Sequence, residues 1–351
     1  MFSRRREWVG LDIGSSGVKL VQLAKSGKEY RLEKLGMQEL DAGVIVDGVI
    51  MNAQAVVLAI QTLFSEQSVK AKDVALSVSG HSVIVKRIKL PVMTRDELAE
   101  SIKWEAEQYI PFDVKDVSID CHILGRSEGE ANQMDVVLVA VKKDKLQEYT
   151  GLVVEAGLRP VVVDVDAFAL GNMYEMNYEI REGEVVALVN IGASVMNIHI
   201  LKGGNFVFTR DISIGGNRYN ETIQGELAVD YPTAERAKRG EPVEGIDQES
   251  LSGIIQSINM EIASEIVRSF DYFKMTSVCK TIDQILLSGG LSKLSGLVSQ
   301  IAEKSGTPVE KVNPFRRVEV PQKLFNLEYR AHMGPMVAVG VGLAMRAGEA
   351  S

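Results

Sequence analysis

A glycine- and serine-rich segment follows the first apolar stretch of the chain and could hold a phosphate group. Glycines let a ligand approach the backbone closely, and the amides and hydroxyls of such a turn can donate to phosphate oxygens. Asp12 could hold a hydrated magnesium ion, and Lys19 could neutralise phosphate charge. The alternative is a plain hairpin with a polar tip, because a short motif standing alone is weak evidence. The segment reads Asp12-Ile13-Gly14-Ser15-Ser16-Gly17-Val18-Lys19.

The same pattern occurs a second time. Here asparagine, Asn190, replaces Asp12, and Asn197 replaces Lys19. In both copies an apolar strand precedes the motif, and two strands joined by a glycine turn come after it. An internal repeat of this length describes the whole architecture. It predicts two similar lobes whose phosphate-type turns face each other across a ligand. The second copy reads Asn190-Ile191-Gly192-Ala193-Ser194.

Further polar or glycine-rich turns follow predicted strands and suit a nucleotide. A short helix predicted over 233–240 places Glu235 and Lys238 on one face, beside Arg239, where they could contact a ribose or an adenine edge. The turns contain Asp164 and Asp166, Gly215 and Gly216, and Ser288, Gly289, Gly290 and Leu291.

Composition narrows the class of protein. The 351 residues suffice for about two domains, and the net charge of −8 argues against nucleic acid as a partner. The two cysteines, Cys121 and Cys279, lack CxxC spacing, and the four histidines lack metal-ligand spacing, so a disulfide framework or zinc site is not expected. We find no signal peptide and no apolar stretch long enough to span a bilayer. A cytoplasmic protein is therefore expected, with Arg4–Arg6 as a solvated tail.

Hydrophobic periodicity predicts the elements that must position these residues. A three-stranded meander is predicted over 8–40, and its counterpart begins near Val185. Thr94 and Glu97 form a capping box that opens a helix over 94–110. Other predicted helices cover 52–67, 143–156, 167–176, 219–225, 254–274, 294–303 and 334–347, and other strands cover 73–79, 81–89, 114–124, 133–141, 161–165 and 285–288.

These elements divide the chain into lobes and a compact inserted unit. The predicted segments are the N-terminal part of the first-lobe core (1–89), the inserted unit (90–158), the connecting helix of the first-lobe core (159–184), the second-lobe core (185–225), an outer subdomain of the second lobe (226–283), the rest of the second-lobe core (284–333) and a C-terminal helix that returns to the first lobe (334–351).

The order of these segments resembles the actin-like ATPase superfamily, an α/β, ribonuclease H-like duplicated fold that includes actin, the DnaK chaperones, sugar kinases and FtsA. The resemblance implies that Mg-ATP binds between the lobes. In its terms, the phosphate loops are 12–19 and 190–194, the connecting segments are 164–170 and 334–342, the adenosine turn is 288–290, and 235–239 is similar to the adenosine-contacting helix of DnaK.

The inserted unit narrows this resemblance. FtsA carries such a unit before the first connecting segment, and the stretch from Leu90 to Phe112 is most similar to PilM proteins of type IV pilus machines. That resemblance implies a partner, the cytoplasmic N-terminal peptide of the inner-membrane protein PilN, together with other platform proteins and an indirect attachment to the inner membrane. Homo-oligomers are common among actin relatives. Trp104 and Phe112 are candidate aromatic anchors for the peptide, while Tyr109 fits core packing better.

Hydrolysis in this superfamily needs acidic groups near the metal and a group that orients water. Asp12 supplies the first, and Asp166, or Asp164 in a shifted alignment, would orient the water. The second phosphate loop normally opens with aspartate, and Asn190 cannot act as a base. We therefore expect this chain to bind Mg-ATP and to hydrolyse it slowly or not at all.

Two alternatives to a pilus scaffold are a small-molecule kinase of the same fold and an FtsA-type division protein. A kinase needs a carboxylate at the substrate hydroxyl, which Asn190 does not provide. FtsA ends in a membrane-binding amphipathic helix, and no such helix is expected in residues 347–351.

Overall fold

A β-sheet forms the centre of each lobe. The computed structural model describes residues 8–27, 29–127 and 129–346, so the Arg4–Arg6 tail and residues 347–351 lie outside it. The first sheet has strand order β10-β6-β1-β2-β3-β16, and the second has β13-β12-β11-β14-β15. Strands of the first sheet are β1 (Trp8–Gly14), β2 (Gly17–Ser26), β3 (Glu29–Glu39), β6 (Asp73–Val78), β10 (Arg159–Val165) and β16 (Val318–Glu319). Those of the second are β11 (Val185–Ile191), β12 (Met196–Lys202), β13 (Asn205–Ile212), β14 (Gln284–Ser288) and β15 (Val309–Lys311).

The two sheets repeat one topology. The order β10-β6-β1-β2-β3 corresponds to β15-β14-β11-β12-β13, with an antiparallel meander beside parallel strands in each. Register places Asp12 opposite Lys19 and Asn190 opposite Asn197. The predicted duplicated α/β fold is therefore confirmed, and the two candidate phosphate turns lie at the ends of equivalent strands, β1 and β11.

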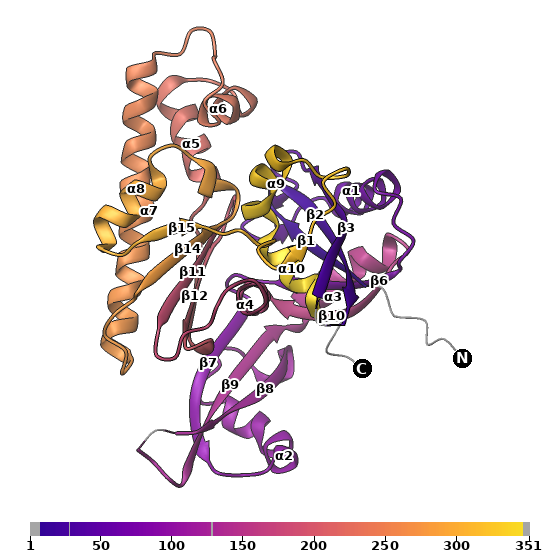
Figure 1. Ribbon diagram of the computed structural model, residues 1–351, viewed down its shortest axis with the longest axis vertical. Helices are drawn as coiled ribbons and strands as arrows, with labels where there is room; N and C mark the ends of the chain where they lie inside the picture. Colours follow the sequence, from indigo (N-terminus) through magenta and orange to yellow (C-terminus); the bar gives the residue numbers. More distant parts are fainter. Residues whose placement is uncertain (1–7, 28, 128, 347–351) are drawn as a thin grey trace.

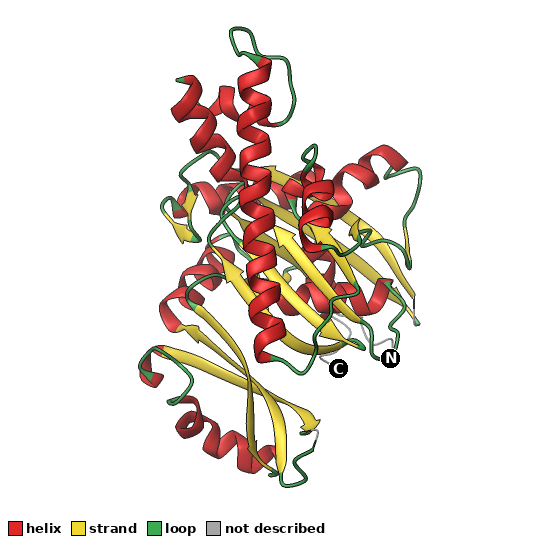
Figure 2. Cartoon of the chain, turned by 90° about the vertical axis from the view of Figure 1, so that its left-hand side faces the viewer, coloured by secondary structure: helices red, strands yellow, loops and turns green. Residues whose placement is uncertain are grey.

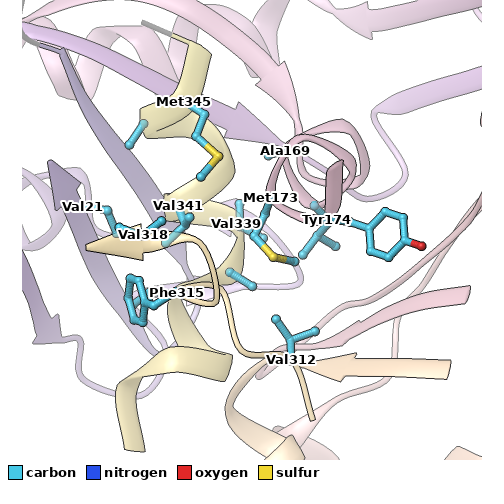
Figure 3. Packing of buried hydrophobic residues seen from close by; sticks show 14 of the residues in the cluster. Val21, Ala169, Met173, Tyr174, Val312, Phe315, Val318, Val339, Val341 and Met345 are labelled. Atoms are coloured by element: carbon cyan, nitrogen blue, oxygen red, sulfur yellow. The ribbon is translucent and has the colours of Figure 1, made fainter. Parts of the chain in front are cut away.

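Two helices occupy the space between the sheets. Figure 1 shows α4 and α10 between the lobes, and Figure 3 shows their side chains packed with residues of both lobes, including Val21 of the first and Val312 of the second. The two lobes are therefore joined by one apolar cluster around α4 and α10. The helices are α4 (Asp166–Asn177) and α10 (Ala338–Met345).

Small residues let α10 approach its neighbours closely. A Cβ on Gly342 would lie 1.7 Å from the Ala169 carbonyl oxygen of α4, and one on Gly10 would lie 2.2 Å from the Gly340 carbonyl oxygen. Neither position has room for a larger side chain, because the opposing atoms belong to the backbone.

Other helices cover the outer faces of the sheets. In the first lobe α1 and α3 pack together against the sheet, and in the second the long helix α7 runs along its sheet, as Figure 2 shows. The helices are α1 (Ala53–Glu66), α3 (Lys143–Glu155), α5 (Gly216–Leu227), α6 (Tyr231–Lys238), α7 (Gln248–Thr276), α8 (Leu297–Ser305) and α9 (Leu327–Met333).

The inserted unit is a separate sheet with one covering helix. Its strand order is β7-β9-β8, and α2 packs on one face around a buried apolar cluster. In Figure 1 this unit projects away from both lobes. The predicted capping box of α2 is present, with Thr94 Oγ1 accepting from the Glu97 amide at 3.2 Å. Its elements are β7 (Val83–Pro91), α2 (Arg95–Ala106), η1 (Val114–Asp116), β8 (Val117–Arg126) and β9 (Gln133–Lys142).

The structure divides the chain differently from the predicted inserted range 90–158. Strand β7 pairs with β9 from Val83 onward, so it belongs to the inserted sheet. Helix α3 instead buries Tyr149, Leu152 and Val153 in the first-lobe core. We therefore place the inserted unit at 83–142.

Several element bounds also differ from prediction. Up to residue 346, where the described part ends, the helix predicted over 334–347 is a 3-10 turn followed by α10. The helix predicted from residue 294 starts at Leu297 after another 3-10 turn. The hairpin of β4 and β5 was not predicted. Among the described residues no helix is both long and apolar enough to cross a membrane. The remaining elements are β4 (Ile45–Val46), β5 (Val49–Ile50), η2 (Gly290–Lys293) and η3 (Gly334–Val337).

Candidate functional site

The first phosphate-type turn carries a shielded ion pair. Strand register brings Lys19 opposite Asp12, and Lys19 Nζ lies 3.0 Å from Asp12 Oδ2, with both side chains about 15% exposed or less. A Cβ on Gly14 would lie 3.4 Å from the same nitrogen. The cation is therefore held directly above the backbone of the turn, where it could meet a phosphate.

Asp166, at the start of α4, lies close enough to this ion pair to feel the charge of Asp12. Ser77, at the end of β6, donates to Asp166 Oδ1 at 2.5 Å. Burial, and next the negative charge of Asp12, raise the pKa of Asp166 to about 6. The parallel strands β1, β6 and β10 thus bring their carboxyl ends together, which is where open α/β sheets place ligands.

Asp164 points elsewhere. Its Oδ1 accepts from the Val165 amide at 2.8 Å, and its Oδ2 lies 3.2 Å from Arg346 Nε, after α10. Of the two predicted water-orienting aspartates, the structure places only Asp166 beside Asp12.

A row of polar side chains crosses the second sheet at its phosphate-type turn. Ser288 Oγ donates to Asn190 Oδ1 at 3.1 Å, and Asn190 Nδ2 donates to Asn197 Oδ1 at 3.1 Å. Asn197 Nδ2 then donates to Asp211 Oδ1 at 2.8 Å. The chain of bonds follows the strand order β14-β11-β12-β13, so the Asn190 amide is already bonded on both sides.

The second turn itself is braced by α5. The amides of Gly216 and Asn217 donate to the carbonyls of Gly192 and Ala193 at 3.0 and 2.8 Å. Asn217 Nδ2 also donates to Ser194 Oγ at 3.1 Å. These bonds fix the turn that would face the phosphates.

The predicted adenosine contacts meet around the start of α5. A Cβ on Gly216 would lie 3.5 Å from Lys238 Nζ of α6 and 3.7 Å from Leu291 Cδ2 of η2. Lys238 Nζ lies 2.5 Å from Glu235 Oε2, and burial lowers the pKa of Lys238. Three segments far apart in sequence are thus brought together, as a nucleotide site would need.

Glycines at two turns have different roles. Gly289 has φ of +87°, and a Cβ there would lie 2.2 Å from the Ile191 carbonyl oxygen, while a Cβ on Gly215 would lie 2.5 Å from the Gly192 carbonyl oxygen. These two positions are closed by backbone packing. A Cβ on Gly290 would meet nothing within 4 Å, so this glycine borders open space.

Arg239 connects the lobes at the outer end of the site. Its guanidinium lies 2.8 Å from Glu235 Oε1 and 3.2 Å from Glu39 Oε1, at the end of β3. Glu235 belongs to the second lobe and Glu39 to the first. Arg239, a predicted adenosine contact, therefore also bridges the two lobes.

Comparison with known proteins agrees with this geometry. Residues 10–348 match the model of a family described as type IV pilus assembly protein PilM. The chain belongs to the PilM family. A solved PilM-PilN type IV pilus biogenesis complex contains a chain 29% identical to this one, with a TM-score of 0.88 over 98% of this chain and 99% of that chain. Membership assigns the chain to type IV pilus assembly and does not favour the kinase or the division protein.

More distant structures share only the fold with this PilM-family chain. The ethanolamine utilization protein EutJ from Carboxydothermus hydrogenoformans is 14% identical, with a TM-score of 0.57 over 96% of this chain and 88% of that chain. MreB5 of Spiroplasma citri bound to AMPPNP is 13% identical, with a TM-score of 0.54 over 98% of this chain and 96% of that chain. The predicted actin-like ATPase fold is thereby confirmed.

Sequence reasoning missed several residues of the site. Ser77 had a readable signal, a hydroxyl at the end of a buried strand parallel to β1. Asp211 and Lys145 had none, since their partners lie far away in sequence: Lys145 Nζ of α3 donates to the Gly48 carbonyl and also interacts electrostatically with Asp166.

The candidate partner anchors lie on the inserted unit of this PilM-family chain. Trp104 on α2 is 75% exposed. Phe112 is half-buried, with Lys142 Nζ 4.5 Å from its ring centre. Tyr109 packs against the apolar cluster of the unit. Trp104 is thus the aromatic residue that this unit offers most openly to a partner.

Proposed function

We propose that this chain is a nucleotide-binding scaffold of type IV pilus assembly that holds Mg-ATP between its lobes. The observation that carries the proposal is the pair of phosphate-type turns at equivalent strand ends, one containing the Asp12–Lys19 ion pair and the other braced by α5. MreB5, which shares the fold, was solved with AMPPNP. The paired turns and the open space at Gly290 fit a nucleotide.

Each group of residues has a role in this proposal. Asp12 would hold the hydrated magnesium ion, and Lys19 would contact phosphate oxygens. Gly216, Lys238 and Leu291 would contact the adenosine. Bound Mg-ATP would supply a compact, highly charged group that both lobes contact at once, which favours their closed arrangement.

We expect hydrolysis to be slow or absent. Asn190 carries no charge and cannot take a proton from water, and its amide already forms hydrogen bonds with Asn197 and Ser288. Asp166 is the remaining candidate for orienting water.

The proposed partner is PilN, through its cytoplasmic N-terminal peptide, at the inserted unit. A relative 29% identical to this chain was solved in a PilM-PilN complex. Binding PilN would hold the chain at the cytoplasmic face of the inner membrane, where other platform proteins and further copies of the chain could assemble.

Replacing Asp12 tests the nucleotide site. We expect Asp12→Ala to weaken Mg-ATP binding by about tenfold or more, because the magnesium ligand is lost and Lys19 loses its partner. Calorimetric titration of nucleotide-stripped protein measures this, with phosphate release followed on the same samples. Asp41→Ala, an exposed aspartate just after β3, is the control and should bind as the wild type does. Unchanged affinity in Asp12→Ala would contradict the proposal, and steady phosphate release would contradict slow hydrolysis.

Replacing Trp104 tests the partner surface. We expect Trp104→Ala to weaken binding of a synthetic PilN N-terminal peptide about tenfold, since exposed aromatic anchors carry much of the binding energy of such contacts. Lys103→Ala, the neighbouring exposed residue of α2, controls for a change in the helix. Equal peptide affinity in the two variants, measured by fluorescence anisotropy, would remove Trp104 from the interface.

A further inference from the structure

One short segment of the chain, here called the corner, forms hydrogen bonds with both lobes at the candidate nucleotide site and leads directly into the inserted unit. This corner is the segment 77–81, which runs from the last two residues of β6 into the loop before β7. Ser77 donates to Asp166 at 2.5 Å in the first lobe. The Gly80 amide donates to Asp211 Oδ2 of the second lobe at 2.6 Å, and His81 Nε2 lies 2.7 Å from Ser213 Oγ. Strand β7 starts two residues later, at Val83.

Asp211 fixes the direction of the polar row behind the second phosphate-type turn. A carboxylate only accepts hydrogen bonds, so Asn197 must turn its NH₂ group toward Asp211 and its oxygen toward Asn190. Asn190 must then turn its own oxygen toward Ser288. The orientation of the amide at the turn therefore depends on Asp211, and the second oxygen of Asp211 is bonded to the corner.

The bond from Asp211 crosses between lobes at the base of the inserted unit. The Asp211 side chain is partly withdrawn from solvent, which raises its pKa, and hydrogen bonds in such a place are stronger than those at the surface. Strand β13, which ends next to Asp211, also contacts β7 directly. A shift of one lobe relative to the other must therefore move the corner, break its bonds or do both.

We propose that Asp211 is a positioning residue that couples nucleotide binding between the lobes to the placement of the inserted unit. This inference rests on the proposed nucleotide site. Closing the lobes on a nucleotide moves Asp166 and Asn190 relative to each other, and the corner at 77–81 is bonded to Asp166 directly and to Asn190 through Asp211 and Asn197. Strand β7 follows the corner, so the unit that carries Trp104 is biased by the nucleotide.

Hydrogen exchange on the intact chain tests the coupling. In the wild type, saturating Mg-AMPPNP should slow amide exchange of β7 by about threefold or more, in addition to protecting residues 12–19. Asp211→Asn puts an NH₂ group against either the Gly80 amide or the Asn197 NH₂ group. The variant is compared with the wild type at a nucleotide concentration that saturates the protection of its own residues 12–19, whatever its affinity, and under this condition it should lose the protection of β7. The matched control is Asp283→Asn, because Asp283 accepts from the Val185 amide at 2.7 Å at the other end of the same sheet.

The outcomes separate the two proposals. If calorimetry finds no nucleotide binding to the wild type, the proposed function fails first and the coupling fails with it. If nucleotide binds but leaves β7 unchanged, or if Asp211→Asn keeps the response of β7, the coupling alone is overturned. If Asp211→Asn does not fold, Ser213→Ala can be used instead, because it removes the contact between Ser213 and His81 of the corner. This variant should show at most half of the wild-type response of β7, and a full response would overturn the inference.

Discussion

Gly342→Ala should leave little folded protein, whereas Gly340→Ala, two residues earlier in the same helix, should fold. A Cβ on Gly342 would lie 1.7 Å from the Ala169 carbonyl oxygen, a backbone atom that cannot rotate away. A Cβ on Gly340 would lie 3.1 Å from Val21 Cγ2, a side-chain atom that can shift slightly. Forcing α10 away from α4 should reduce the free energy of unfolding by more than about 3 kcal/mol.

The pair is informative because both changes add the same methyl group to α10. Alanine is otherwise favoured over glycine in a helix by about 0.5–1 kcal/mol, so propensity alone would stabilise both variants. Urea unfolding followed by circular dichroism measures the difference. Similar stability of the two variants would mean that α10 does not pack so closely against Ala169.

Asp166→Asn should raise the free energy of unfolding at pH 7.5 by about 1–3 kcal/mol. The pKa of Asp166 is about 6 in the folded protein, against an ordinary value of 3.8, so above pH 6 folding holds a charge that burial and Asp12 disfavour. As the pH falls from 6 toward 4, the folded wild type takes up this proton before the unfolded chain does, and the wild type gains stability. The asparagine variant lacks this gain, so its advantage shrinks with falling pH.

Unfolding in urea at pH 7.5, 6 and 4.5 checks both the sign and the pH window. Asp41→Asn, at an exposed position, should match the wild type at each pH. A variant that is less stable than the wild type at pH 7.5 would show that the bond from Ser77 outweighs the burial of charge.

Local pattern was enough to predict the duplicated core. The repeat of Asp12 and Lys19 by Asn190 and Asn197, seven residues apart in each copy, sets the register of both meanders. Antiparallel strands joined by a short turn can pair in few ways, so the spacing of two residues along the chain predicts that they lie opposite each other in the sheet. The repeat also predicted that the two phosphate-type turns lie at equivalent strand ends.

Contacts between distant segments could not be predicted in this way. The bond from Gly80 to Asp211 joins residues of different lobes, and no local pattern marks either one. We predicted helix α3 as part of the inserted unit because it comes directly after β9. From the sequence alone, its apolar face could pack equally well against the first-lobe core. The packing of Tyr149 and Leu152 in the structure shows that α3 belongs to the first-lobe core and not to the inserted unit.

The position of α10 also has a consequence for synthesis of the chain on the ribosome. Strands β1 and β2 emerge early, but the helix that covers them, Ala338–Met345, is translated only after the whole second lobe. Contacts between such distant segments form late and slowly. The apolar face of β1 and β2 around Gly10 and Val21 therefore stays uncovered during translation until α10 has been made. The second lobe can form its own core around α7 before the first lobe is complete.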